Sequence, residues 1–126
     1  MIPRFRAWDK ELQTMLDVSL IDFKKRVLVG EHWKFGETNF TSFDDIKRMQ
    51  STGLFDKNGK EIFEGDILKS NKYITSVFYE RGAYRVKLRR TPNTTVTMDL
   101  MVFIEKYKTR IVGNIYENPE LLEVKE

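Results

Sequence analysis

The residues best suited to chemistry in this sequence are the cations of residues 71–97. This segment holds six lysines and arginines against one glutamate and so carries +5, whereas the whole chain of 126 residues carries +3. Apolar and polar residues alternate over 83–90, which predicts a strand with Arg85, Lys87 and Arg89 on one face. Neighbouring cations would then lie about 6 to 7 Å apart, near the repeat of a nucleic-acid backbone.

Further residues extend this basic stripe at both ends. Arg81 lies in the predicted turn before the strand, and Tyr79 or Tyr84 offers an aromatic ring for stacking on a base. The candidate nucleic-acid or partner-binding residues are Arg81, Tyr84, Arg85, Lys87, Arg89 and Arg90. An acidic host protein would fit the same cations, and so would a solvated strand face on which lysine and arginine prevent edge-to-edge aggregation.

Catalytic constellations are missing from the sequence. The chain has no cysteine and a single histidine, His32, which excludes thiolate chemistry and any site with two histidine ligands. It also lacks a nucleophile elbow and a phosphate-binding glycine loop. Glu61, Glu64 and Asp66 could together bind magnesium, but in a strand Glu61 and Glu64 point to opposite faces. We therefore expect no catalytic residues, no metal and no cofactor.

Composition places the chain among globular proteins. Hydrophobic residues make up 40% and aromatic residues 13% of the chain, enough for one compact core or for a small core with an appended hairpin layer. There is no apolar run of about 18 residues, and charge precedes any apolar segment at the N-terminus. We expect a cytoplasmic protein with no membrane segment.

Strand patterns dominate the first part of the chain, which we expect to span residues 1–48. Strands are predicted over 3–8, 15–23 and 26–29, forming an N-terminal antiparallel β layer. Residues 31–40 are predicted to be loop. A capping-box pattern at residues 42–45 then predicts a short connecting helix with Phe43, Ile46 and Met49 on one face.

The second part, residues 49–126, is rich in turn signals. Asn58-Gly59 predicts a type I′ hairpin, and a second hairpin is predicted about Arg81-Gly82. Asp99 is expected to cap a short helix before a closing strand over 110–116, and Asn118 is expected to cap a last helical turn. This pattern predicts a mainly β protein whose C-terminal part is a small SH3-like β-barrel.

Three blocks of sequence resemble the YopX family of small phage and prophage proteins. They are FRAWDK at residues 5–10, MQSTGLFDKNGKEIFEGDIL at 49–68 and VGNIYENPELL at 112–122. The signature positions have turn chemistry in common, which favours a structural role. They are Gly53, Asp56, Asn58, Gly59, Gly65, Asp66, Gly113, Asn114, Asn118 and Pro119. The basic stripe lies outside these blocks.

The sequence and the resemblance leave three functional hypotheses. The first is a non-enzymatic binding module of phage or prophage origin that acts in the bacterial host cytoplasm and binds nucleic acid or a host protein. The second is a structural or self-assembly protein, with Phe5, Trp8 and Trp33 as aromatic anchors in a homo-oligomer. The third and weakest is a carboxylate-dependent, metal-assisted hydrolase.

Overall fold

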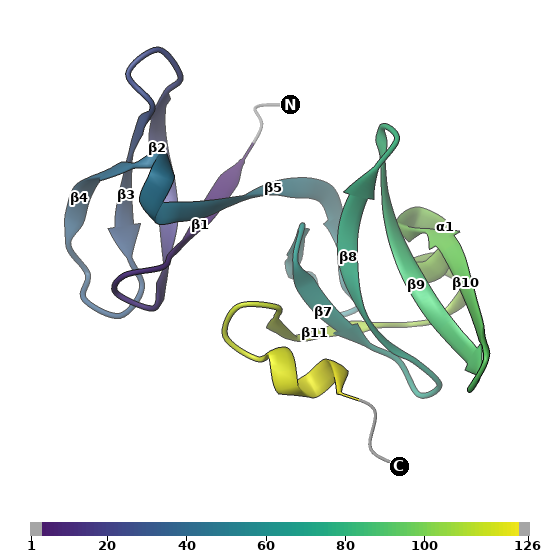
Figure 1. Ribbon diagram of the computed structural model, residues 1–126. Helices are drawn as coiled ribbons and strands as arrows, with labels where there is room; N and C mark the ends of the chain where they lie inside the picture. Colours follow the sequence, from purple (N-terminus) through teal and green to yellow (C-terminus); the bar gives the residue numbers. More distant parts are fainter. Residues whose placement is uncertain (1–3, 124–126) are drawn as a thin grey trace. The chain divides into compact units, whose positions relative to one another are not determined.

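A computed structural model describes residues 4–123. The chain divides into two compact units, Met1–Ser51 and Thr52–Glu126, and is mainly β, with two antiparallel sheets (Figure 1). Within residues 4–123, one sheet has six strands and the other has five. Among the described residues, no helix has the length and apolar character needed to cross a bilayer.

The first unit is an antiparallel sheet in which a four-strand meander is followed by a strand that returns to pair with the first. Its strands are β1 (Phe5–Asp9), β2 (Thr14–Asp22), β3 (Val27–His32), β4 (Thr38–Ser42) and the first part of β5 (Ile46–Phe55). Ala7, Leu16, Leu28 and Ile46 form its buried cluster. The three predicted strands of the N-terminal β layer are thus confirmed, with ends that differ by one to three residues. The largest difference is at β3, which continues to His32, and residue 3 of the first predicted strand lies outside the described residues.

Two local predictions for this unit are wrong. Part of the predicted loop over 31–40 is β4, which pairs antiparallel with β3. A strand shows alternating apolar and polar residues when one of its faces is buried, but Phe40 in β4 is 80% exposed. The sequence of β4 therefore lacks that alternation. The predicted connecting helix is one 3-10 turn, Phe43–Asp45, because the chain from Ile46 pairs with β1 and tertiary pairing overrides the helical spacing.

The second unit contains most of the strands and the α-helix. Its elements are β6 (Glu61–Phe63), β7 (Asp66–Lys69), β8 (Ile74–Glu80), β9 (Ala83–Thr91), β10 (Thr94–Asp99), α1 (Leu100–Lys106), β11 (Arg110–Asn114) and the 3-10 turn η2 (Pro119–Leu122). Its core is formed by Ile62, Leu68, Val77, Val86, Leu88, Leu100 and Phe103. The predicted helix after Asp99 is confirmed, and the Asp99 carboxylate accepts the Met101 N–H at 2.9 Å.

Strands β7 to β10 follow one another as an antiparallel meander, and β11 returns to pair with β7. Figure 1 shows this sheet in teal and green, with α1 between β10 and β11 in the chain. Within residues 4–123 the strand pairing does not close into a barrel. The SH3-like barrel therefore stays a prediction.

The turns of this unit agree only in part with their predicted types. The hairpin about Arg81-Gly82 has positive φ at both residues, 50° and 81°, as a two-residue loop requires. At Asn58-Gly59, in contrast, positive φ occurs at Gly59 and not at Asn58, so the type I′ prediction is wrong. Asn118 precedes η2 but makes no side-chain capping hydrogen bond, because its Oδ1 accepts the Asn114 N–H instead.

Candidate nucleic-acid interface

The predicted alternation along β9 is present in the structure. Val86 and Leu88 are buried in the core, whereas Lys87 and Arg89 are exposed on the opposite face. The Lys87 ammonium lies 5.4 Å from the ring centroid of Phe78 on neighbouring β8. Lys87 thus stays at the surface beside an aromatic ring, where a cation–π contact holds it without neutralising its charge.

The candidate cations do not form one continuous site. Arg81 lies in the β8–β9 turn and Arg85 beside it, where the Arg85 Nε donates to the Glu80 carbonyl at 3.3 Å. Arg89 and Arg90 lie at the other end of β9, about 25 Å from Arg81 at the usual rise per strand residue. The structure therefore separates these four candidates into two groups, and Arg89 and Arg90 of the second group line a hollow.

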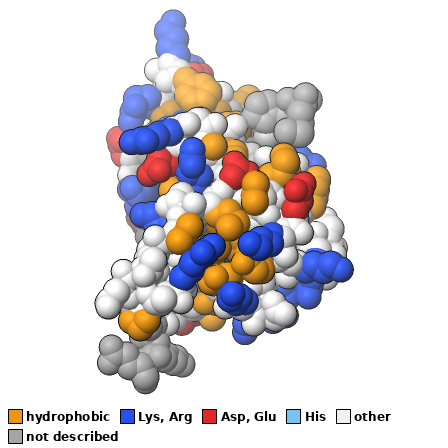
Figure 2. Space-filling model, turned by 90° about the vertical axis from the view of Figure 1, so that its right-hand side faces the viewer, with side chains coloured by type: hydrophobic (Ala, Val, Ile, Leu, Met, Phe, Trp, Pro, Cys, Tyr) orange, Lys and Arg blue, Asp and Glu red, His pale blue; other side chains and the backbone are white. Residues whose placement is uncertain are grey.

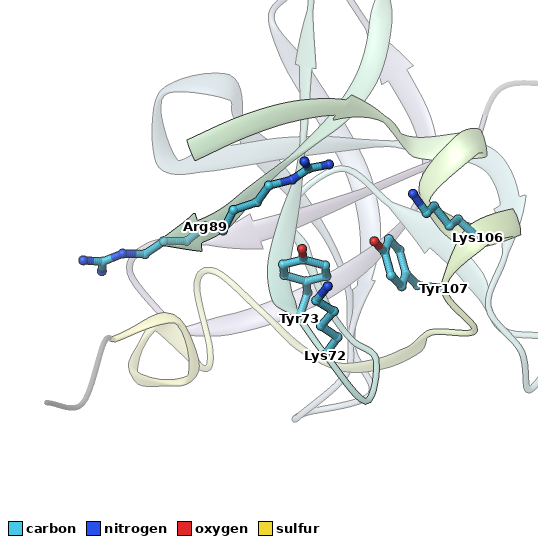
Figure 3. A pocket seen from close by; sticks show the side chains of 6 residues that line it. Lys72, Tyr73, Arg89, Lys106 and Tyr107 are labelled. Carbon is cyan, nitrogen blue, oxygen red and sulfur yellow. The ribbon is translucent and has the colours of Figure 1, made fainter. Parts of the chain in front are cut away.

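A surface hollow of about 410 Å³ is lined by four cations and two tyrosines, namely Lys72, Tyr73, Arg89, Arg90, Lys106 and Tyr107. The rings of Tyr73 and Tyr107 meet edge to face, with centroids 5.2 Å apart and an interplanar angle of 82°. Figure 3 shows their hydroxyls on the same side, with Lys72 and Lys106 flanking the pair.

Local hydrogen bonds fix the two segments that supply the tyrosines. In the β7–β8 turn, the buried Ser70 Oγ accepts the N–H groups of Lys72 at 3.2 Å and Tyr73 at 2.9 Å. At the end of α1, Tyr107 is the C-cap, and its N–H donates to the Phe103 carbonyl. Both tyrosine rings pack against the core, so their positions are set by burial as well as by the turns.

A second hollow adjoins the first. Its volume is about 490 Å³, and it shares Lys72, Tyr73 and Arg89 with the first hollow. The remaining lining residues follow the outer face of the sheet and the C-terminal segment; they are Ile74, Thr75, Ser76, Lys87, Thr95, Leu122 and Glu123. Together the two hollows form a groove that continues along β8 and β9.

The cations of the first hollow keep their charge available. Within residues 4–123, Lys72, Arg89, Arg90 and Lys106 form no ion pair. The Arg89 guanidinium donates to the Pro92 carbonyl at 3.0 Å, which orients the group but leaves the charge uncompensated. Figure 2 shows lysine and arginine side chains around a group of hydrophobic side chains on one face of the molecule. An anion entering the groove would meet several uncompensated positive charges.

Tyr84, the candidate for base stacking, lies away from this groove. It is half-buried on the same side of β9 as Val86 and packs against the core. Its ring meets Tyr79 at 5.2 Å between centroids, edge to face. Burial, and then the charge of Glu64, raise the pKa of the Tyr84 hydroxyl above its usual value. Its position suits a packing residue better than a stacking platform.

The aromatic side of the groove was missed from the sequence. Tyr73, Lys106 and Tyr107 were not among the candidates, and Lys72 was counted only as part of the basic segment. The one signal for them is a Lys-Tyr dipeptide that occurs at residues 72–73 and again at 106–107. Nothing in the sequence relates the two copies, because the contact between them depends on how α1 packs on the sheet.

Of the three acidic residues that could bind magnesium, Asp66 forms a hydrogen bond within a turn. Asp66 is 1% exposed, and its Oδ2 accepts the Phe63 N–H at 2.8 Å in the β6–β7 turn. Within the described part of the chain, no group of three histidine, aspartate or glutamate side chains is placed to hold a metal ion.

Asp56 shows most clearly what the signature residues do. Its Oδ1 accepts the N–H groups of Asn58 at 2.9 Å and Lys60 at 2.8 Å, and its Oδ2 accepts the Ile111 N–H at 3.0 Å. Burial alone would raise the pKa of Asp56, but these donors outweigh it and hold the pKa below its usual value. Asp56 thus ties the β5–β6 turn to β11.

The last signature block forms a second network of turn bonds. The Asn114 Oδ1 accepts the N–H groups of Tyr116 at 3.0 Å and Glu117 at 2.9 Å. A Cβ at Gly113 would lie 2.7 Å from the Cγ of Asn118, so this position has no room for a side chain. Pro119 begins η2 with its fixed φ. These residues shape the chain after β11 and leave no side chain converging on a site.

The first unit contains a buried contact between His32 and Asp9 and an exposed aromatic side chain. Nε2 of His32 lies 3.1 Å from Asp9 Oδ2, and both side chains are buried. Trp8, considered as an interaction anchor, is only 6% exposed and belongs to the core. Trp33 is 51% exposed and lies under the Arg6 guanidinium at 5.9 Å. Of the tryptophans, only Trp33 is therefore accessible to a partner.

Fold and site together define a class of small, mainly β protein with a basic, tyrosine-lined groove and turns held by buried aspartates. Comparison with known families shows that the profile described as YopX protein matches residues 4–123. The chain belongs to the YopX family, as its sequence blocks predicted.

Among solved structures, the chain is similar to the crystal structure of protein EF1440 from Enterococcus faecalis. The two are 30% identical, the alignment covers 98% of this chain and 99% of the other, and the TM-score is 0.66. A search of curated proteins found no match.

Proposed function

We propose that this protein is a non-enzymatic binding module that binds nucleic acid through the groove of its second unit. The observation that carries the proposal is the hollow lined by Lys72, Arg89, Arg90 and Lys106 together with two tyrosines. Cations without ion pairs attract phosphates, and aromatic rings beside them offer contacts to bases. Of the basic stripe predicted along β9, the proposed binding surface keeps the end that carries Arg89 and Arg90.

The setting we propose follows the family resemblance. A YopX protein of phage or prophage origin would act in the cytoplasm of its bacterial host. We also propose that the second unit is an SH3-like scaffold, since a four-strand meander is followed by a short helix and a last strand that pairs with the first. Small β scaffolds of this kind present grooves to oligonucleotides.

The test is a titration of a fluorescently labelled oligonucleotide, followed by anisotropy, at 50 and 200 mM salt. If four phosphates contact the four cations, the logarithmic salt slope should be about −3, so affinity should fall roughly 50-fold between these concentrations. Absence of binding at 50 mM salt would refute the proposal.

Two matched double variants distinguish binding in the groove from an effect of net charge alone. Lys72→Ala with Lys106→Ala should lower affinity at least tenfold, because each lysine lines the hollow. Lys24→Ala with Lys25→Ala removes the same charge from an exposed turn of the first unit and should change affinity less than twofold. Equal losses in the two double variants would show that only net charge matters.

A second candidate function is self-assembly, favoured by one observation. β4 lies at an edge of its sheet and carries Phe40, which is 80% exposed. An open strand edge with an exposed aromatic side chain can pair with a second copy of the chain. Light scattering at high protein concentration tests this, and a monomer that persists there would rule it out.

A further inference from the structure

The hollow beside α1 has features beyond positive charge. Tyr73 comes from the β7–β8 turn and Tyr107 from the end of α1, yet their rings are in contact. Each ring also lies under the lysine that precedes it in the sequence. The Lys72 ammonium is 5.4 Å from the Tyr73 centroid, and the Lys106 ammonium is 5.7 Å from the Tyr107 centroid.

This arrangement differs from a plain phosphate-binding surface. Phosphates need only cations and N–H donors, whereas here both aromatic rings line the cavity itself. Stacking of a base on an aromatic ring is more favourable than a cation–π contact at an exposed site. A base that displaces a lysine from its ring would therefore gain free energy, and the released lysine would remain beside the base's phosphate.

We infer that this hollow is a subsite for an unpaired base and its flanking phosphates, so that the protein prefers single-stranded over double-stranded nucleic acid. The inference rests on the proposed function and names its substrate class. A volume of about 410 Å³ falls in the range of small-ligand cavities, and the adjoining 490 Å³ leaves room for a neighbouring nucleotide. The bases of a duplex are stacked and paired, so their faces cannot reach a tyrosine within a concave site.

The order of the lining residues gives the strand a path. Arg89 and Lys72 line both hollows, so a phosphate between two bases would lie near them. Lys106 and Arg90 belong to the first hollow and Lys87 to the second, where each could contact an outer phosphate. Glu123 lines the second hollow and would oppose a phosphate there. Among residues 4–123, no carboxylate lines the first hollow, which is thus the main subsite.

The test compares a labelled 20-nucleotide single strand with the duplex of the same sequence at 50 mM salt. The wild-type protein should bind the single strand at least tenfold more tightly. Tyr73→Leu and Tyr107→Leu keep an apolar side chain against the core but remove the stacking ring, so each should weaken single-strand binding about 5- to 100-fold. Duplex binding, which depends on the cations, should change less than twofold in these variants.

The second tyrosine pair of the same unit supplies the control. Tyr79 is 54% exposed and meets Tyr84 in a similar edge-to-face contact, but it lines neither hollow. Tyr79→Leu should leave both affinities within twofold of wild type. A single strand carrying 2-aminopurine adds a measurement on the unmodified protein, since stacking on a tyrosine should quench its fluorescence on binding.

These measurements distinguish the subsite for an unpaired base from nucleic-acid binding as such. Equal affinity for single strand and duplex, with unchanged 2-aminopurine fluorescence, would overturn the base subsite and leave nucleic-acid binding intact. Failure to bind either form at 50 mM salt would overturn both. Losses for Tyr79→Leu as large as those for Tyr107→Leu would also overturn the subsite, because the effect would then be general to the fold of this unit.

Discussion

Replacing Asp56 by asparagine should destabilise the second unit by removing a hydrogen bond between the β5–β6 turn and β11. The asparagine has the same shape but only one oxygen acceptor, while the aspartate accepts the N–H groups of Asn58, Lys60 and Ile111. If the amide oxygen takes the Oδ1 position, its NH₂ group faces the Ile111 N–H, and two donors then oppose each other in a buried site.

The size of the effect follows from the bonds lost. A hydrogen bond to a charged group contributes about 1.5 to 3 kcal/mol. The variant loses the hydrogen bond from Ile111, and its hydrogen bonds from Asn58 and Lys60 then go to a neutral oxygen, so the free energy of unfolding should fall by about 2 to 4 kcal/mol. With an m-value of about 2 kcal/mol/M, the urea midpoint should fall by about 1 to 2 M.

The assay has to observe the second unit. Both tryptophans, Trp8 and Trp33, belong to the first unit, so their fluorescence reports on that unit, while far-UV circular dichroism reports on both. Urea unfolding should be followed by circular dichroism, together with hydrogen exchange of the Ile111 amide. That amide should lose protection in the variant beyond the loss expected from global stability.

The control is Asp44→Asn in the first unit. The Asp44 side chain is 80% exposed and pairs with Arg26 at 3.4 Å, and such surface pairs contribute about 0 to 1 kcal/mol. It should leave the midpoint almost unchanged. The reasoning on Asp56 would be refuted if the two variants shifted the midpoint equally, or if Ile111 kept its protection in Asp56→Asn.

Further predictions concern pH, burial and the turn after β11. Burial alone would raise the pKa values of Asp9 and Asp56. Both pKa values nevertheless lie below the ordinary value, because each carboxylate accepts backbone N–H groups and Asp9 also contacts His32. Their stabilisation should be complete above about pH 5, where the carboxylates are ionised in the unfolded chain as well, and be lost as pH falls through the lowered values. The free-energy gap between wild type and Asp56→Asn should therefore shrink between about pH 5 and pH 2. His32→Ala should cost about 3 kcal/mol in urea unfolding, since it leaves the buried Asp9 without its histidine partner, and a loss under 1 kcal/mol would contradict this reading. Trp8→Ala should cost about 3 to 5 kcal/mol and Trp33→Ala under 1 kcal/mol, as the exposed fractions of 6% and 51% require; similar losses would be inconsistent with the fold. Gly113→Ala should lower the thermal midpoint through contact with Asn118, and Asn118→Gly in the same chain should restore part of the loss, which a double-mutant cycle measures.

Local chemistry explains what was predictable from the sequence. The positive φ of Arg81 and Gly82 and the capping bond of Asp99 depend on neighbours in the chain, so residue types alone indicated the hairpin and the helix. The alternation of buried Val86 and Leu88 with exposed Lys87 has a period of two residues and was visible for the same reason. Family membership followed from blocks of turn-forming residues.

Tertiary structure decided the rest, because it depends on contacts between residues far apart in the chain. β4 exists because β3 offers it a hydrogen-bonding edge, although its own residues are mostly exposed. The hydrogen bond from Ile111 to Asp56 joins residues 55 positions apart and adds a long-range contact to the local turn bonds that the sequence predicted for Asp56. The groove has the same origin. Its cations were apparent as composition, but the meeting of Tyr73 with Tyr107 depends on the packing of α1 against the core, which no local pattern specifies.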